Sequence, residues 1–204
     1  MLSPLKALNI PFYFFYNERE VNTMHCWKIL NIYKQYGLPR ILLWTVIAFI
    51  LTLCTSYLAF TLTYTQPFND DYFLIFATLV IALYPIHKCV HYLTLLDYKD
   101  EVETEWKIMY GYVPTLHLRI KEILPKRRYI ITRLAPFTTI NSAIIISMLL
   151  APNVIHYGSI LLAYHTSICV IDILYVKNLL HSPKEAQIEE TPRGFEILVP
   201  PNIR

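Results

Sequence analysis

The stretch YFLIFATLVIALYPIHKCVH, residues 72–91, decides the fold of this chain. From Tyr72 to His87 it contains no Asp, Glu, Lys or Arg. Two other runs, residues 41–69 and 134–171, lack the same four residue types. A helix needs about 20 apolar residues to cross a hydrocarbon core of about 30 Å. The three runs therefore predict α-helices that span a membrane.

The composition of the whole chain agrees with this interpretation. Of 204 residues, 55% are hydrophobic and 16% are charged, which is the wrong balance for a soluble globule. We expect an α-helical integral membrane protein of the plasma membrane, with the lipid bilayer as its surroundings. The net charge of +3 is small and calls for no nucleic acid partner. The four expected transmembrane helices cover residues 41–65, 72–96, 134–150 and 157–176.

The placement of basic residues predicts the orientation. Lys and Arg gather in residues 1–40, 97–133 and 177–204, and they are absent from residues 66–71 and 151–156. Basic loops favour the cytoplasmic side of a membrane. Three basic regions alternating with two base-free turns indicate four spans, with both termini in the cytoplasm.

The segments between the spans carry some strand-like patterns. In the cytoplasmic loop, residues 97–133, Leu116, Leu118 and Ile120 alternate with polar residues, which is typical of a half-buried strand. We expect a β-hairpin in which Trp106 to Val113 pairs with this strand after a turn near Pro114. In the cytoplasmic tail, residues 177–204, the strand-like piece is Phe195 to Val199.

The amino-terminal residues 1–23 differ from the rest of the chain. Glu18-Arg19-Glu20-Val21 is what a purine-rich ribosome-binding site would encode in frame, just before Met24. We expect translation to start at Met24 and residues 1–23 to be a non-native extension. Residues 24–199 then form a single membrane domain.

Two histidines in the second span are the chemical centre of the chain. His87 and His91 lie four residues apart and share one face of a helix. In the fourth span, Asp172 is an isolated acid, and a carboxylate inside a membrane needs a cation or a proton. Both spans run inward, and His87 and Asp172 lie equally far along them, so the side chains should meet at one depth. Two imidazoles, one carboxylate and a water make an open tetrahedral zinc site.

Other polar residues surround this predicted metal site. His165 and Cys169 share the helix face of Asp172, so we expect them to support the ligands or line a cavity. Asn141 in the third span is a weaker candidate for the same interior. The four cysteines, Cys26, Cys54, Cys89 and Cys169, show no pair spacing, and the last three fall in apolar segments where cysteine packs as a small hydrophobe. Lone interfacial or loop positions are expected for His25, His117, His156 and His181.

Several motifs, taken in order, resemble a known family. That family is an uncharacterised group of bacterial multi-pass membrane proteins assigned as zincin peptidases, and the likeness covers about residues 24–199. It implies a zinc cofactor and descent from a metallopeptidase. The residues that carry it are Cys26-Trp27-Lys28, Tyr84-Pro85-Ile86-His87 with His91, Ala135-Pro136, His165 through Asp172 to Tyr175, and Gly194-Phe195-Glu196-Ile197-Leu198.

One position departs from the zincin pattern. A working zincin has His-Glu-x-x-His, in which the Glu takes a proton from the metal-bound water. This chain has Lys88 at that position. Three interpretations stay open: a zinc site without hydrolysis, an active membrane metallopeptidase, or a non-enzymatic protein whose His/Asp cluster is structural or binds a membrane-protein partner. The sequence names no substrate.

Overall fold

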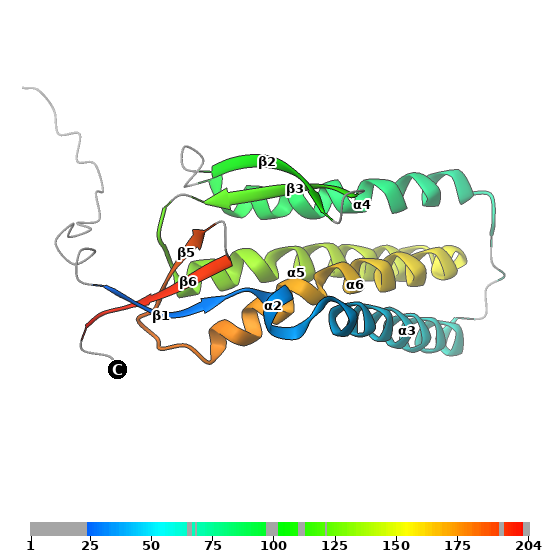
Figure 1. Ribbon diagram of the computed structural model, residues 1–204. Coiled ribbons are helices and arrows are strands. Elements are labelled where there is room, and N and C mark those ends of the chain that lie inside the picture. The colour runs from blue at the N-terminus through cyan, green and yellow to red at the C-terminus, as the bar shows by residue number, and fades with distance from the viewer. Residues whose placement is uncertain are drawn as a thin grey trace, which may run out of the picture.

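The computed structural model describes residues 24–64, 67, 69–96, 102–109, 113–120, 122–191 and 194–201. Residues 1–23, and with them the expectation of a non-native extension, lie outside this part. Four long helices run side by side (Figure 1). Each is long and apolar enough to cross a membrane, so the expected four apolar helices are confirmed. Their bounds are α3 (Leu38–Thr63), α4 (Phe73–Thr94), α5 (Lys126–Leu150) and α6 (Ile155–Leu180).

Helix α5 differs most from its expected range. It begins at Lys126, although the uncharged run begins only at Leu134. The expected range followed hydropathy alone, whereas backbone hydrogen bonds also continue through the basic residues that precede the apolar run. Those first two turns carry Tyr129, Thr132 and Arg133, which prove central to the site.

Helix α6 is the centre of the bundle. It packs against α3 and α5, and α4 packs against α5 and α6. More than half of its apolar window is buried inside the protein. Small residues allow this close approach: Gly158 lies directly against Met148 of α5. The helix with the most protein contact is therefore the one that carries His165, Cys169 and Asp172.

A small antiparallel sheet covers one end of the bundle (Figure 1). Its strand order is β1-β6-β5-β4, so the first strand of the described chain pairs with the last. The sheet joins the segments before α3, before α5 and after α6, which places all three at the same end of the bundle. Its strands are β1 (His25–Leu30), β4 (Leu124–Pro125), β5 (Gln187–Thr191) and β6 (Gly194–Val199).

Most of this sheet differs from what the sequence predicts. The strand-like piece at Phe195 to Val199 is present as β6, but β1, β4 and β5 were not expected. The segment before α3 forms β1 and the short helix α2 (Ile32–Tyr36), where only an interfacial lead-in was expected.

The sheet has an apolar core against the helix ends. Alternate residues of β5 and β6 point inward, and they meet Leu30, Leu95 and Leu179 in one buried cluster. Gly194 allows β1 to approach: its φ is +135°, and an added Cβ would lie 2.3 Å from the Leu30 carbonyl oxygen. The same inward alternation that buries Ile188 also points Glu190 toward α5.

The expected hairpin in the long loop is present. Strands β2 (Val102–Met109) and β3 (Val113–Ile120) pair antiparallel, with Trp106 opposite Leu116. Met109 pairs with Val113, so the chain reverses before Pro114 and not at it. Pro114 lies within β3, opposite Ile108.

The other end of the bundle is closed by short connections. The Asn69 amide donates to the Asn153 carbonyl at 3.1 Å. His156, expected to stand alone, lies with its Nε2 3.4 Å from Asp70 Oδ1. Tyr157 donates to the Asp70 carbonyl at 3.4 Å. The two turns between spans are therefore tied to each other.

Candidate metal centre

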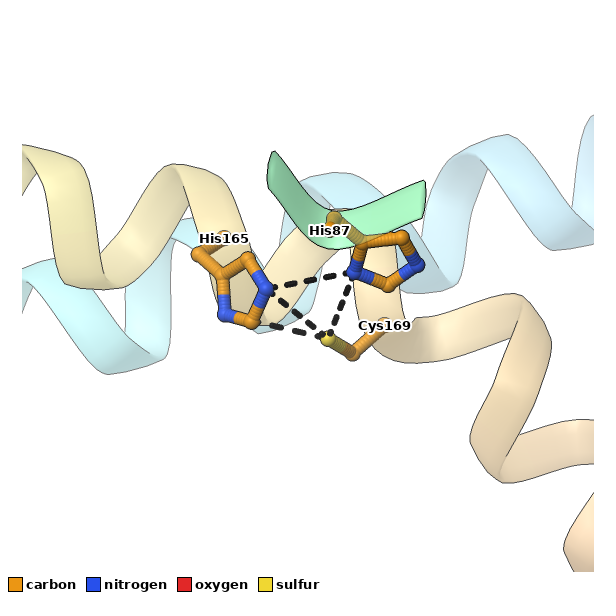
Figure 2. Close-up of side chains that lie close together, drawn as sticks. All are labelled: His87, His165 and Cys169. Carbon is orange, nitrogen blue, oxygen red and sulfur yellow. Dashed lines mark hydrogen bonds between the residues drawn. The ribbon is translucent and has the colours of Figure 1, made fainter. Parts of the chain in front are cut away.

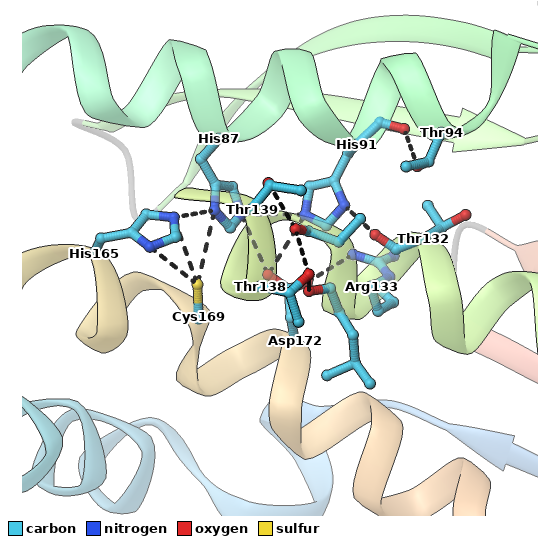
Figure 3. A network of polar contacts seen from close by, with 12 residues as sticks. His87, His91, Thr94, Thr132, Arg133, Thr138, Thr139, His165, Cys169 and Asp172 are labelled. Carbon is cyan, nitrogen blue, oxygen red and sulfur yellow. Dashed lines mark hydrogen bonds and ion pairs between the residues drawn. The ribbon is translucent and has the colours of Figure 1, made fainter. Parts of the chain in front are cut away.

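His87 and His91 of α4 meet Asp172 of α6 inside the bundle (Figure 3). The two Nε2 atoms are 3.1 Å apart. Asp172 Oδ2 lies 3.3 Å from His87 Nε2 and 3.5 Å from His91 Nε2. All three side chains are buried. The shared helix face and the matched depth therefore bring together the three residues that the sequence singles out.

This triangle of atoms has the size of a metal coordination site. Zinc binds His nitrogen and Asp oxygen at about 2.0–2.2 Å in tetrahedral geometry, which places neighbouring ligand atoms about 3.3–3.5 Å apart. The three observed separations, 3.1, 3.3 and 3.5 Å, lie at or close to this range. The side chains can therefore hold a zinc ion with small adjustments.

The proton of the His91 ring is placed by a proline. Pro136 has no backbone N–H, so the Thr132 carbonyl one turn earlier has no helical hydrogen-bond partner. His91 Nδ1 lies 2.9 Å from that carbonyl and donates to it. A neutral imidazole carries one proton, so Nε2 presents its lone pair to the triangle. Pro136 thus frees the backbone acceptor that orients the His91 ring on the neighbouring helix.

The proton of the His87 ring is placed by a chain of polar side chains. His87 Nδ1 lies 3.2 Å from His165 Nε2, and His165 Nδ1 donates to Asn141 Oδ1 at 2.7 Å. His165 Nε2 then accepts from His87 Nδ1, which leaves the His87 Nε2 lone pair facing Asp172. Of the residues in the triangle, His165 therefore supports His87. Asn141 belongs to this interior, as expected.

Asp172 is not the isolated carboxylate that the sequence indicates. Arg133 Nη1 donates to Asp172 Oδ1 at 3.1 Å, so a cation of the protein itself already pairs with this carboxylate, which was not predicted from the sequence. The cause is the early start of α5, which places Arg133 inside the bundle. The two carboxylate oxygens divide their partners: Oδ1 faces the guanidinium and Oδ2 faces the imidazoles. The sequence did contain a signal for this ion pair: an acid within one span, Asp172, and a base just before another span, Arg133.

Arg133 is itself enclosed by partners that come from distant elements. Its Nη2 lies 3.1 Å from Glu190 Oε1 of β5 and 2.6 Å from the Tyr129 hydroxyl. Tyr129 in turn donates to Glu190 Oε1 at 3.0 Å. The guanidinium carbon lies 5.0–5.2 Å from the ring centroids of Tyr129, Tyr175 and Phe195. Glu190 of the sheet thereby fixes the position of Arg133, which in turn pairs with Asp172.

Lys88 occupies the position of the zincin glutamate. It is half-buried, and its Nζ lies 5.7 Å from the centroid of the Tyr84 ring, one turn earlier on α4. A cation next to His87 in the chain disfavours a metal ion at the triangle. Near the triangle, the carboxylates with described side chains are Asp172 and Glu190, and both are held by Arg133.

Cys169 lies beside the triangle, next to the rings of His87 and His165. Its Sγ is 3.9 Å from His87 Nδ1 and 3.7 Å from His165 Nε2. His25 and His181 are exposed and away from the triangle, as expected for lone histidines. The side chain of His117 lies outside the described residues.

Fold and site together define a helical-bundle protein with a candidate metal centre of two histidines and a carboxylate. The chain belongs to the family described as "Putative zincin peptidase", whose family model matches residues 80–187, a little more than half of the chain. The match contains all three residues of the triangle. No curated protein and no solved structure matches the chain.

Proposed function

We propose that this protein is a multi-pass membrane protein that binds one zinc ion at His87, His91 and Asp172 and does not hydrolyse peptides. The observation that carries the proposal is the convergence of three lone-pair-bearing atoms within 3.5 Å of one another. Two deprotonated imidazole nitrogens beside a carboxylate oxygen repel one another unless a cation lies between them. Zinc supplies that charge and polarises a water or carbonyl in its open position.

The supporting side chains favour the same role. Both histidines donate their single ring proton, on Nδ1, to a fixed acceptor and leave Nε2 free, as metal-binding histidines generally do. Arg133 fixes the orientation of Asp172 while leaving Oδ2 available. These contacts would hold the three ligands in place before an ion arrives.

Lys88 is the reason for proposing that hydrolysis is absent. Peptide hydrolysis at zinc needs a base that takes a proton from the bound water. A lysine at this position is a cation and cannot accept that proton. Arg133 engages the carboxyl group of Glu190, which is not free to replace the missing glutamate.

The membrane placement is part of the proposal. We infer that α3, α4, α5 and α6 span the plasma membrane, with both termini and the sheet in the cytoplasm. The three basic regions all lead into the same end of the bundle, since β1, β4 and β5–β6 form one sheet. Labelling of single cysteines from one side of sealed vesicles tests this. An exposed cysteine at position 26 should react only from the cytoplasmic side, and the cysteine of a Lys184→Cys variant, at an exposed position of the tail, should do the same.

A second candidate function has a specific observation behind it. Asp172 already has a cation in Arg133, so the cluster could be held by a proton instead of a metal ion. In that case one histidine is an imidazolium that donates to Asp172 Oδ2, and the cluster orders the bundle for a partner. Metal content separates this structural alternative from the zinc site.

The experiment is a measurement of zinc in detergent-purified protein by mass spectrometry. We expect one zinc per chain in the wild type, and little or none in His91→Ala and Asp172→Asn. His181→Ala, which removes an exposed histidine, is the matched control and should keep its zinc. A folded wild type without metal would contradict the proposal and support the structural alternative.

Hydrolysis is tested on the same preparations. Wild-type protein loaded with zinc should leave casein and a quenched-fluorescent library of membrane peptides uncut. Cleavage that stops on chelation, and that is missing in Asp172→Asn, would show an active peptidase and overturn the non-hydrolytic part of the proposal.

A further inference from the structure

A second group of metal-binding atoms lies on the other side of the His87 ring. It consists of His87 Nδ1, His165 Nε2 and Cys169 Sγ, and Figure 2 shows the three side chains facing one another. All three residues are buried. We propose that these atoms form an alternative site for a soft, thiophilic ion, Cu(I), and that His87 serves either this site or the zinc site. The proposal shares His87 with the zinc site but does not rest on zinc being bound.

The separations between the three atoms suit such an ion. The two nitrogens are 3.2 Å apart, and the sulfur lies 3.7 Å from His165 Nε2 and 3.9 Å from His87 Nδ1. Metal–nitrogen bonds of about 2.0–2.1 Å and metal–sulfur bonds of about 2.3 Å place a nitrogen and a sulfur about 3.5–3.8 Å apart. One ion can therefore contact all three atoms after small movements.

The orientation of His165 also favours a ligand role. Its Nδ1–H is committed to Asn141 Oδ1 at 2.7 Å, so its lone pair is on Nε2 and points toward His87 and Cys169. Asn141 in turn donates to the Thr166 hydroxyl at 3.5 Å, which fixes its carbonyl oxygen toward His165.

Charge and ligand type select Cu(I) among the common ions. Soft thiolate ligands favour Cu(I), and imidazole is compatible with it. When the ion binds, the Cys169 thiol releases its proton to the medium and forms the copper–sulfur bond. A single positive charge with one thiolate and two neutral imidazoles gives a neutral complex, which is the least costly state in an apolar interior. A divalent ion would leave a net charge there.

His87 couples the two sites because it carries one proton. With the proton on Nδ1, the ring donates to His165 and offers Nε2 to zinc. With the proton on Nε2, the ring donates to Asp172 Oδ2, 3.3 Å away, and offers Nδ1 to Cu(I). A neutral imidazole has one free lone pair, so filling one site removes a ligand from the other.

The test is a competition titration of detergent-purified protein with Cu(I) under anaerobic conditions, against bicinchoninate as the competing chelator. The starting protein carries Cys26→Ser, Cys54→Ala and Cys89→Ser, which replace the three exposed cysteines and leave Cys169 as the one thiol. We expect one Cu(I) per chain, a sulfur ligand in the copper X-ray absorption spectrum, and release of bound zinc on loading.

Three variants separate the two sites. Cys169→Ser should weaken Cu(I) binding on the order of 100-fold or more and should keep zinc. His91→Ala should lose zinc and keep Cu(I). Cys169→Ala repeats the first variant without a hydroxyl, in case Ser is poorly tolerated. Cu(I) binding unchanged in both Cys169 variants, or a copper spectrum without sulfur, would overturn the proposal and would leave the zinc site untouched. Full occupancy by both ions together would overturn the exchange at His87.

Discussion

The two ends of the helix bundle handle charge in opposite ways. At the sheet end, Asp172 and Glu190 are buried, Arg133 is only 17% exposed, and several partners fix the position of each. At the other end, Asp70 pairs with His156 while 89% of the Asp70 side chain stays exposed. Exposed ion pairs contribute little, whereas a buried charge that loses its partner is strongly destabilising. The difference indicates that stability and chemistry are both concentrated at the sheet end.

The largest expected effect comes from removing the arginine that Asp172 and Glu190 share. Arg133→Met leaves Asp172 and Glu190 without their shared cation, which costs about 3–5 kcal/mol for a buried pair. We expect the midpoint of thermal unfolding in detergent to fall by about 10 °C. Adding Glu190→Gln to this variant should recover part of the loss. No recovery, or an unchanged midpoint, would mean that the arginine is not the centre of this network.

The next effect is at the contact between the first and last strands. Gly194→Ala places a Cβ 2.3 Å from the Leu30 carbonyl oxygen, at a φ of +135° that other residues rarely adopt. Moving backbone atoms away from the new Cβ is energetically costly, so we expect the free energy of unfolding to fall by about 2–3 kcal/mol. Thermal unfolding measures it, and hydrogen exchange should show loss of protection in β1. A midpoint equal to that of the wild type would argue against the pairing of β1 with β6.

A glycine in the bundle gives the matched comparison. Gly158→Ala also creates a contact of 2.3 Å, but with Met148 Cγ, part of a flexible side chain. The Met148 side chain can change rotamer, so we expect the free energy of unfolding to fall by about 1 kcal/mol, less than for Gly194→Ala. The same unfolding measurement applies. A larger loss here than at the sheet would reverse the order that the structure predicts.

The smallest effect is expected at the exposed pair. Asp70→Asn removes the charge facing His156 but keeps the backbone carbonyl that Tyr157 contacts. We expect a shift in the unfolding midpoint below about 2 °C, and less at high salt, because the pair is largely solvated. A shift as large as that of Arg133→Met would show that both ends of the bundle bear buried charge.

The sequence predicts the helices and the triangle because their signals are local or periodic. Uncharged runs locate the long helices, and the spacing of His87 and His91 places both imidazoles on one face. The prediction that Asp172 lies at the same depth as His87 follows from counting residues along two spans that run in the same direction. Each of these inferences needs only helix geometry and the position of the apolar boundary.

The sheet and the network around Arg133 are not available from such signals. Strand β1 pairs with β6 across almost the whole chain, and β4 is two residues long, too short for any alternation. Glu190 reaches Arg133 on a strand of the tail, and Arg133 lies just outside the uncharged run. The sheet and the Arg133 network both depend on contacts between residues far apart in the sequence, and no local sequence pattern predicts such contacts. The presence of Pro136 predicts that the Thr132 carbonyl lacks a helical hydrogen-bond partner. The sequence does not show that His91 takes that place.

Zinc X-ray absorption spectroscopy on wild-type protein with one equivalent of zinc tests the central claim most directly. The account predicts nitrogen and oxygen ligands at about 2.0–2.2 Å, with the signature of two imidazoles and no sulfur. In Asp172→Asn the same spectrum should be lost together with bound zinc. A spectrum that contains sulfur, or one that is unchanged in Asp172→Asn, would contradict the assignment of the zinc site to His87, His91 and Asp172.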